Sequence, residues 1–214
     1  EMALTGYGCE DAFHSIDLID QVNRELITIL DTTANMNAIV CIGLPVYFNK
    51  SVFNCVAVIQ HGKIIGIVPK QNLAGDGVHY EPRWFKAWKP NQTTDIEIVD
   101  MMVPFVDLVF ESNGVRFGLE ICEDAWSNSR PGSALARRGV DIILNPSASH
   151  FSMGKRDVRT RFVVEGSRAF DCAYVYANLL GCESGRIIYD GDCILANGGT
   201  LLELGDRFSL EDYT

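Results

Sequence analysis

Cys122 has the surroundings that best suit covalent chemistry in this chain of 214 residues. It follows the mostly apolar segment 115–121, which we expect to be a strand, and it precedes Glu123 and Asp124. A thiol held at the end of a strand can meet a substrate that the following loop admits. Because the thiolate is the reactive form and two carboxylates flank it, a nearby cation would be needed. On spacing alone, a packed structural cysteine is the commoner case.

Lys70 is a candidate for that cation. It follows Pro69 at the end of an expected strand and opens a long polar loop. A lone lysine is usually a solvated surface charge, but here it could stabilise a thiolate and the oxyanion of a tetrahedral intermediate. His150 offers a second arrangement, a cysteine–histidine dyad with Cys122, which distance along the sequence does not exclude.

Other kinds of site have little support in the sequence. Neither the phosphate-binding loop G-x-x-x-x-G-K-[ST] nor the nucleophile elbow G-x-S-x-G occurs. No two of the seven cysteines form C-x-x-C, and the four histidines are not spaced as metal ligands, so we expect no metal site. Most of the cysteines lie in apolar runs, which is typical of reduced thiols packed inside a cytoplasmic protein.

Composition narrows the range of partners. The net charge is −10 and the basic residues are scattered among acidic ones, so we expect no nucleic-acid surface. No apolar run approaches the ~20 residues that a membrane span needs. A hydrophobic fraction of 47% is enough for a full core, which indicates a soluble globular protein.

The elements that must position these residues mix helices and strands. Apolar side chains at helical spacing predict a helix over residues 10–32. Runs of β-branched residues predict strands at 38–48, 52–60, 64–68, 95–99, 103–110, 115–121, 141–145, 173–178, 187–189 and 192–196. Two further helices are expected at 133–138 and 156–171, the first in a parallel crossover between two strands.

Turns and loops complete this arrangement. We predict one hairpin joining 38–48 to 52–60 and a second joining 187–189 to 192–196 around Asp190-Gly191. The connection 69–91 contains three prolines and two tryptophans, and a long loop of this kind is usually functional. The whole chain is therefore expected to form one α/β domain with mixed sheets.

Three segments carry a resemblance to a known family. Glu1–Tyr7, Pro69–Leu73 and Gly118–Asp124, followed by Asn145–Ser149, resemble the nitrilase (carbon–nitrogen hydrolase) superfamily over essentially the whole chain. In that family a glutamate, a lysine and a cysteine arrive in this order, each at a strand end. The resemblance implies a nitrilase-type four-layer α-β-β-α sandwich with mixed sheets.

The resemblance also implies a mechanism. Cys122 would attack the carbon of a carboxamide, while Lys70 and the backbone N–H of Glu123 stabilise the oxyanion. Glu1 would serve as general base for the thiol, then as acid for departing ammonia, and finally as the group that activates water. A second glutamate that supports the triad in this family matches Glu81.

Within the superfamily, two segments are most similar to the glutaminase domain of glutamine-dependent NAD synthetases. They are Gly75–Glu81 and Glu120–Trp126. This likeness implies hydrolysis of glutamine, with ammonia passing to a separate synthetase domain that adenylates nicotinic acid adenine dinucleotide and amidates it to NAD. No cofactor is implied for the glutaminase step, whereas ATP and Mg would be used only by the synthetase domain.

The same likeness implies the substrate-binding residues. Glu123 and Ser149 match positions that hold the amino-acid end of glutamine. Lys155 stands where some members have an arginine, and Trp126 is a further candidate. The loop position at Asp76 can be a tyrosine in other members, so its role stays open.

The sequence alone leaves two alternatives to this function open. A stand-alone amidase or carbamoylase acting on a small aliphatic amide would use the same triad, and a catalytically silent domain is a non-enzymatic possibility. The first strand of the family normally precedes the glutamate, and we expect both this strand and the synthetase domain to lie outside the chain. Glu1 would then be tethered on one side only, and a misplacement of ~1 Å costs about 100-fold in rate. A homo-oligomer is also expected.

Overall fold

The computed structural model describes residues 1–75, 78, 80–183, 187–209 and 211. The chain forms two compact units, Glu1–Leu108 and Val109–Thr214, each built on one mixed sheet. Asp76 and His79, two positions that the sequence analysis considered, lie outside the described residues. No helix in the described part of the chain has the length and apolar character to cross a membrane.

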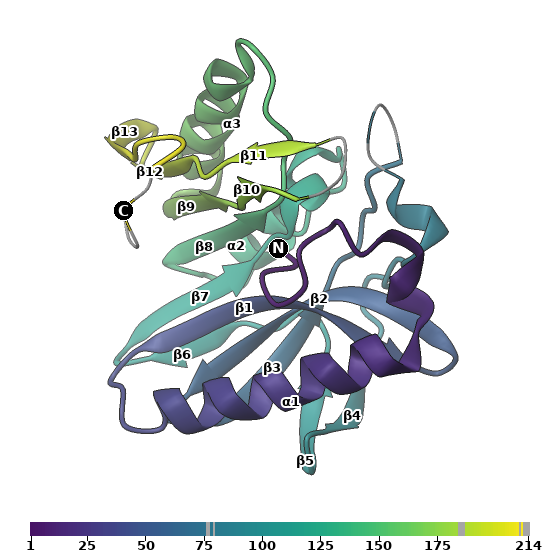
Figure 1. Ribbon diagram of the computed structural model, residues 1–214. Coiled ribbons are helices and arrows are strands. Elements are labelled where there is room, and N and C mark those ends of the chain that lie inside the picture. The colour runs from purple at the N-terminus through teal and green to yellow at the C-terminus, as the bar shows by residue number, and fades with distance from the viewer. Residues whose placement is uncertain (76–77, 79, 184–186, 210, 212–214) are drawn as a thin grey trace. The chain divides into compact units, whose positions relative to one another are not determined.

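The first unit contains a five-stranded sheet in the order β1-β2-β3-β5-β4 (Figure 1). Its strands are β1 (Ile39–Phe48), β2 (Ser51–Gln60), β3 (Lys63–Pro69), β4 (Thr94–Ile98) and β5 (Met101–Phe105). The predicted hairpin is confirmed, because β1 and β2 pair antiparallel from Ile39↔Gln60 to Phe48↔Ser51. Its two turn residues, Asn49 and Lys50, have φ of 46° and 60°, as a two-residue turn that follows strand twist requires.

The helix α1 (Ile16–Thr33) packs on this sheet through Val22, Leu26 and Leu30. These residues are four apart and therefore share one helix face. The prediction of one helix over 10–32 needs a small correction, because Ser15 is extended and separates α1 from a short 3-10 helix, Glu10–His14.

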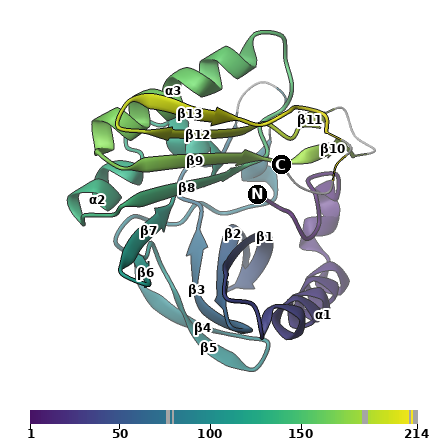
Figure 2. The same cartoon turned by 90° about the vertical axis from the view of Figure 1, so that its left-hand side faces the viewer.

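The second unit contains a six-stranded sheet in the order β13-β12-β9-β8-β7-β6 (Figure 2). Its strands are β6 (Phe110–Ser112), β7 (Val115–Leu119), β8 (Ile142–Ser147), β9 (Ala173–Asn178), β12 (Cys193–Asn197) and β13 (Thr200–Leu204). The central strands β7, β8 and β9 are parallel. The connections between them carry α2 (Gly132–Arg137) and α3 (Lys155–Phe170), which confirms the predicted crossover.

Two strand predictions were wrong. The expected strand 103–110 is divided between β5 and β6, which belong to different sheets because each pairs with its own hairpin neighbour. The expected hairpin around Asp190-Gly191 does not form. Instead β11 (Ile188–Asp190) pairs with β10 (Leu180–Cys182), while β12 pairs with β9 and β13. The short strands β10 and β13 were not predicted.

Candidate active site

A lysine buried between two carboxylates is the central feature of the first unit. The Nζ atom of Lys70 lies 2.7 Å from Oε1 of Glu1 and 2.6 Å from Oε2 of Glu81. Lys70 and Glu81 are each 1% exposed, and Glu1 is 6% exposed. Burying charges is costly unless they are paired and hydrogen-bonded. Three of the predicted catalytic residues therefore meet in one buried cluster.

The end of β3 and the loop that follows it position Lys70 and Glu81. The backbone N–H of Lys70 donates to the carbonyl of Asn54 at 2.8 Å, and the carbonyl of Lys70 accepts from Trp88 at 2.9 Å. Glu81 opens the 3-10 helix Glu81–Arg83, and its Oε2 accepts from the backbone N–H of Ala74 at 2.6 Å. The loop predicted to be functional thus supplies one carboxylate of the cluster.

A close backbone approach positions Glu1. Gly43 of β1 lies against it, and a Cβ atom added at Gly43 would stand 2.7 Å from the carbonyl carbon of Glu1 and 2.8 Å from its Cα. The N–H of Leu4 donates to the carbonyl of Gly43 at 3.1 Å. The absence of a side chain at Gly43 is what allows the segment that carries Glu1 to lie on the strand.

Two further residues of the cluster were not predicted. The hydroxyl of Tyr7 lies 2.6 Å from Oε1 of Glu1 and 2.7 Å from Oε1 of Glu81. The amide Nδ2 of Asn54 lies 2.7 Å from the same two oxygens. The sequence contained a signal for Asn54, because it is a polar residue in the middle of the apolar run of β2 and a buried amide needs hydrogen-bond partners.

The surroundings of the Glu1 carboxyl favour its ionised form. Burial raises its pKa, but the positive charges of Lys70 and the α-amino group, with hydrogen bonds from Lys70 and Tyr7, outweigh burial and hold the pKa at about 2. Glu1 is thus a carboxylate that can accept a proton when its partners change.

Cys122 begins the 3-10 helix Cys122–Trp126, shortly after β7 ends. Its side chain is buried and its φ is 46°, a conformation that non-glycine residues seldom adopt. The turn is closed by Asp124, whose N–H donates to the Ile121 carbonyl at 3.0 Å and whose Oδ2 accepts from the Ile121 N–H at 3.1 Å. Strained backbone of this kind clusters at functional sites, which favours a special role for Cys122 over plain packing.

An ion pair between the partly buried Arg130 and the buried Glu120 lies at the base of the loop that carries Cys122. Nε and Nη2 of Arg130 donate to the two oxygens of Glu120 at 3.0 and 2.5 Å. Glu120 also accepts from the hydroxyl of Tyr174 at 2.7 Å and from the N–H of Gly132 at 2.6 Å. The carboxylate of Glu120 therefore ties together both ends of the segment from residue 120 to residue 132.

Two of the predicted substrate-binding residues, Glu123 and Lys155, share the electrostatic surroundings of Cys122. Burial lowers the pKa of Lys155, and so does the charge of Arg159, while Cys122 and Glu123 act in the opposite direction. The ring of Trp126 packs against Phe162 with centroids 4.8 Å apart. Cys122, Glu123 and Lys155 are thus close enough to interact electrostatically.

Ser149 is held by a second buried network. Its N–H donates to Oδ1 of Asn178 at 2.8 Å, and its carbonyl accepts from Nδ2 of Asn178 at 2.9 Å and from Nη2 of Arg159 at 2.7 Å. Arg159 is fully buried and donates to both oxygens of Asp190 at 2.7 and 2.8 Å. The backbone of Ser149 is therefore fixed by side chains that the sequence analysis had not identified.

His150 lies beside Lys155, with its Nδ1 atom 3.1 Å from the lysine Nζ. The alternative of a dyad between His150 and Cys122 stays a prediction. Among the described residues, no three His, Cys, Asp or Glu side chains are placed to hold a metal ion. The seven cysteines, all within the described residues, form no disulfide.

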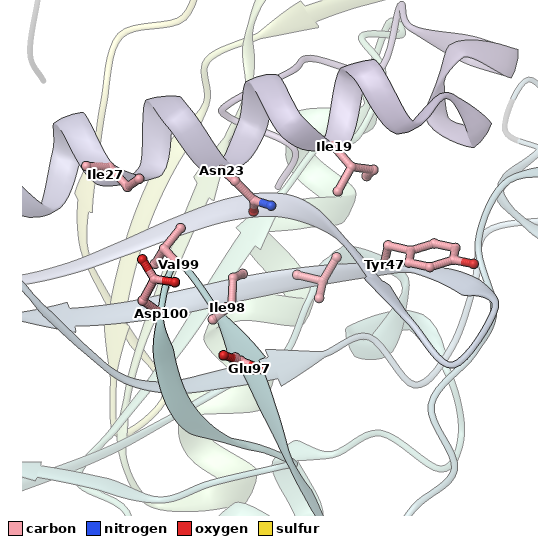
Figure 3. Close-up of a pocket in the computed structure, with 9 residues that line it drawn as sticks. Ile19, Asn23, Ile27, Tyr47, Glu97, Ile98, Val99 and Asp100 are labelled. Carbon is pink, nitrogen blue, oxygen red and sulfur yellow. The ribbon is translucent and has the colours of Figure 1, made fainter.

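The first unit also has a surface hollow, whose lining residues are drawn in Figure 3. It is lined by Ile19, Asn23 and Ile27 of α1, by Tyr47 of β1, and by residues around the β4–β5 turn such as Asp100. None of the predicted catalytic or substrate-binding residues lines this hollow. It is therefore not our candidate active site.

The chain belongs to the carbon–nitrogen hydrolase family, whose model matches residues 1–209. An amidase of the nitrilase superfamily from Nesterenkonia AN1 shares the fold, with a TM-score of 0.76 at 17% identity over 94% of this chain and 70% of that one. The predicted nitrilase-type α/β fold with mixed sheets is confirmed.

The more similar relatives are glutamine-dependent NAD(+) synthetases. The enzyme from Mus musculus is 32% identical over 99% of this chain and 30% of its own length, and the enzyme from Oryza sativa subsp. indica is 35% identical with the same coverage. The crystal structure of the Cytophaga hutchinsonii synthetase is 40% identical with a TM-score of 0.89, covering 99% of this chain and 34% of that one. The chain thus spans about a third of the length of these relatives.

Proposed function

We propose that this domain hydrolyses the side-chain amide of glutamine through a thioester on Cys122. The ammonia would pass to a synthetase part of the same polypeptide, for ATP-dependent amidation of nicotinic acid adenine dinucleotide to NAD. The observation that carries the proposal is the buried Lys70 between Glu1 and Glu81, 2.7 and 2.6 Å away. The proposal is also supported by the similarity of 99% of the chain to glutamine-dependent NAD(+) synthetases.

The first half-reaction forms the thioester. The Cys122 sulfur attacks the amide carbon while the thiol proton moves to Glu1, and the carbonyl oxygen becomes an oxyanion. Lys70 and the backbone N–H of Glu123 stabilise this charge. When the C–N bond breaks, Glu1 returns the proton to the departing nitrogen, and ammonia leaves.

The second half-reaction regenerates the enzyme. Glu1 takes a proton from water, whose oxygen attacks the thioester carbon. The C–S bond then breaks and Glu1 returns this proton to the departing sulfur, which gives the thiol and the γ-carboxylic acid of glutamate, and the acid loses its own proton to solvent. Burial raises the pKa of Glu1, but the charges of Lys70 and the α-amino group, with hydrogen bonds from Lys70 and Tyr7, hold it at about 2 in the resting cluster. An anion drawn to Lys70, whether thiolate or oxyanion, offsets the charge of that lysine, so Glu1 becomes a stronger base when the proton must be taken up.

The substrate's amino-acid end would bind in the second unit. The carboxylate of Glu123 suits an α-ammonium group, and the ammonium of Lys155 suits an α-carboxylate. Ser149 presents a hydroxyl on a backbone that Asn178 and Arg159 hold in place. Trp126, whose ring packs on Phe162, is proposed as a further contact to the substrate. These are the contacts that would separate glutamine from a simple aliphatic amide.

We propose no cofactor for the glutaminase step, because attack, proton transfer and hydrolysis balance with side chains and water alone. ATP and Mg would serve the synthetase part. We propose that the reaction takes place in the cytoplasm, because Cys122 must stay reduced to attack and reduced thiols are the norm there.

The first experiment is covalent labelling with a diazo-ketone analogue of glutamine, read by intact mass and peptide mapping. The polypeptide that carries this domain should gain one adduct on Cys122, and free glutamine should suppress it. Cys122→Ala should abolish both the adduct and ammonia release. Cys182→Ala, which removes an exposed thiol, is the matched control and should change neither.

The same preparation separates the alternatives. Turnover of a small aliphatic amide with no turnover of glutamine would replace the glutaminase by a stand-alone amidase. Lys70→Ala should remove nearly all labelling, whereas a dyad of Cys122 with His150 predicts that labelling persists. An adduct on another cysteine, or none on a folded protein, would refute the proposed function.

A further inference from the structure

The hydroxyl of Tyr7 occupies a position that one proton cannot satisfy. Its oxygen lies 2.6 Å from Oε1 of Glu1 and 2.7 Å from Oε1 of Glu81. Both separations are hydrogen-bond lengths, since O–H···O bonds centre at about 2.7–2.8 Å and those to a carboxylate at about 2.5–2.7 Å. A phenol has one proton to donate. If both carboxyl groups were ionised, one of the two short oxygen–oxygen contacts would hold no proton and would be repulsive.

The other donors of the cluster do not supply the missing proton. Nδ2 of Asn54 has two protons, and it lies 2.7 Å from Oε1 of Glu1, 2.7 Å from Oε1 of Glu81 and 2.9 Å from the Tyr7 oxygen. That oxygen could accept a hydrogen bond from the amide, but this gives Tyr7 no further proton to donate to a carboxylate. Rotating this amide would place its oxygen against two carboxyl oxygens, so the assignment of nitrogen and oxygen is fixed by the surroundings. Lys70 directs protons to the same two carboxyl groups. None of these protons lies between Tyr7 and a carboxylate.

The charges of the side chains lead to the same conclusion. Two carboxyl groups face the single ammonium of Lys70, and all of them are buried. One added proton makes the set of side chains neutral, which burial favours. The α-amino group of Glu1 also acts on that carboxyl; in a polypeptide extended at this end it would be an amide without charge. The proton count at Tyr7 holds in either case.

We propose that Glu1 and Glu81 share one proton through Tyr7, which acts as a relay between them. In one form, Glu81 donates to the Tyr7 oxygen and Tyr7 donates to Glu1. In the other, the directions are reversed, because one proton leaves Oε1 of Glu81 for the Tyr7 oxygen as the Tyr7 proton moves to Oε1 of Glu1. The two transfers balance, create no net charge and need no other reactant.

The relay gives the proposed function a second route for the proton, and in this respect it rests on that function. Glu1 must be a base when the thiol or water is attacked and an acid when ammonia leaves. A shared proton lets Glu1 become the acid even when the thiol proton has already been lost to solvent. Asn54 is then a positioning residue, since its amide holds Oε1 of both carboxyl groups at 2.7 Å.

Infrared difference spectroscopy tests for the shared proton without any turnover. A protonated carboxyl has a C=O stretch apart from the carboxylate bands, and it shifts in D2O. We expect this band at neutral pH in the parent protein, its loss in Glu81→Gln, and a changed frequency in Tyr7→Phe. Glu111→Gln and Tyr47→Phe, at exposed positions of the same residue types, should leave the band unchanged. A parent spectrum without the band, or a band unaffected by both site variants, would overturn the proposal.

Kinetics test the role of Tyr7. In mixtures of H2O and D2O, the parent should show a curved dependence of kcat on the deuterium fraction, because more than one proton moves. Tyr7→Phe should make the dependence linear and narrow the pH range over which kcat stays high. A purely structural Tyr7 would lower kcat without changing either shape. If labelling of Cys122 fails while the infrared band is present, the proposed function falls and the shared proton stands.

Discussion

Gly43→Ala tests how the backbone of β1 positions Glu1. A Cβ atom at residue 43 would lie 2.4 Å from the backbone nitrogen of Met2 and 2.7 Å from the carbonyl carbon of Glu1, where ordinary van der Waals contact begins at 3.4 Å. The shortfall is therefore about 1.0 Å at Met2 and about 0.7 Å at Glu1, and the atoms in the way belong to backbone, which cannot rotate aside. Relief requires the segment that carries Glu1 to move away from the strand.

The size of the effect follows from that displacement. A shift of ~1 Å in a catalytic group costs about 100-fold in rate, so we expect kcat for glutamine to fall on the order of 10- to 100-fold. Overpacking a close contact also costs about 1–3 kcal/mol of stability. The assay is ammonia release under saturating glutamine, paired with urea unfolding to show that the variant is folded under the assay conditions.

The matched control is Gly75→Ala, whose added Cβ would meet, among the described residues, only Pro82, at ordinary distances of 3.6 and 3.9 Å. It should keep kcat within about twofold of the parent, because no atom has to move. A Gly43→Ala protein with parental kcat would refute the reasoning. It would show that Glu1 either does not move or does not act as the base.

Three further outcomes are expected. The folded pKa of Glu1, about 2 against 4.5 for the free carboxyl, gives stability that is present above pH 4.5 and lost as the pH falls to about 2. In Glu1→Gln, the free energy of unfolding measured in urea should therefore decrease by about 3 kcal/mol less than in the parent as the pH falls over this range. Arg130→Met strands the buried Glu120 carboxylate and should cost about 3–5 kcal/mol, against less than about 1 for Arg168→Met in an exposed pair. Lys155→Ala should raise KM for glutamine about 10- to 100-fold with little change in kcat, and Lys155→Arg should not; steady-state kinetics decide it.

Strong local patterns made much of the fold predictable. The apolar runs of β1 and β2, separated by the polar Asn49-Lys50-Ser51, predicted an antiparallel hairpin, and the two strands do pair antiparallel. Lys70 and Glu81 could be proposed because their neighbouring residues form motifs. The strands β10 and β13 could not, since three and five residues with mostly exposed side chains show little of the alternation that marks a strand.

The missed parts of the site depend on contacts distant in sequence. Tyr7 and Asn54 are 47 residues apart, and no spacing rule brings them to the same pair of carboxyl oxygens. The error at Asp190-Gly191 has the same origin. These residues look like a hairpin turn, but Asp190 is buried against Arg159 and Asn178, so tertiary pairing overrode local turn preference.

The conformation of Cys122 has a consequence for how this domain would behave under selection. A residue at φ 46° pays in backbone energy for its placement, and glycine at the same position would relax that strain. Variants that lack the sulfur could therefore withstand heat better than the parent. A screen for thermal stability alone would then enrich inactive variants. Directed evolution of a more stable domain must therefore also select for ammonia release at every round.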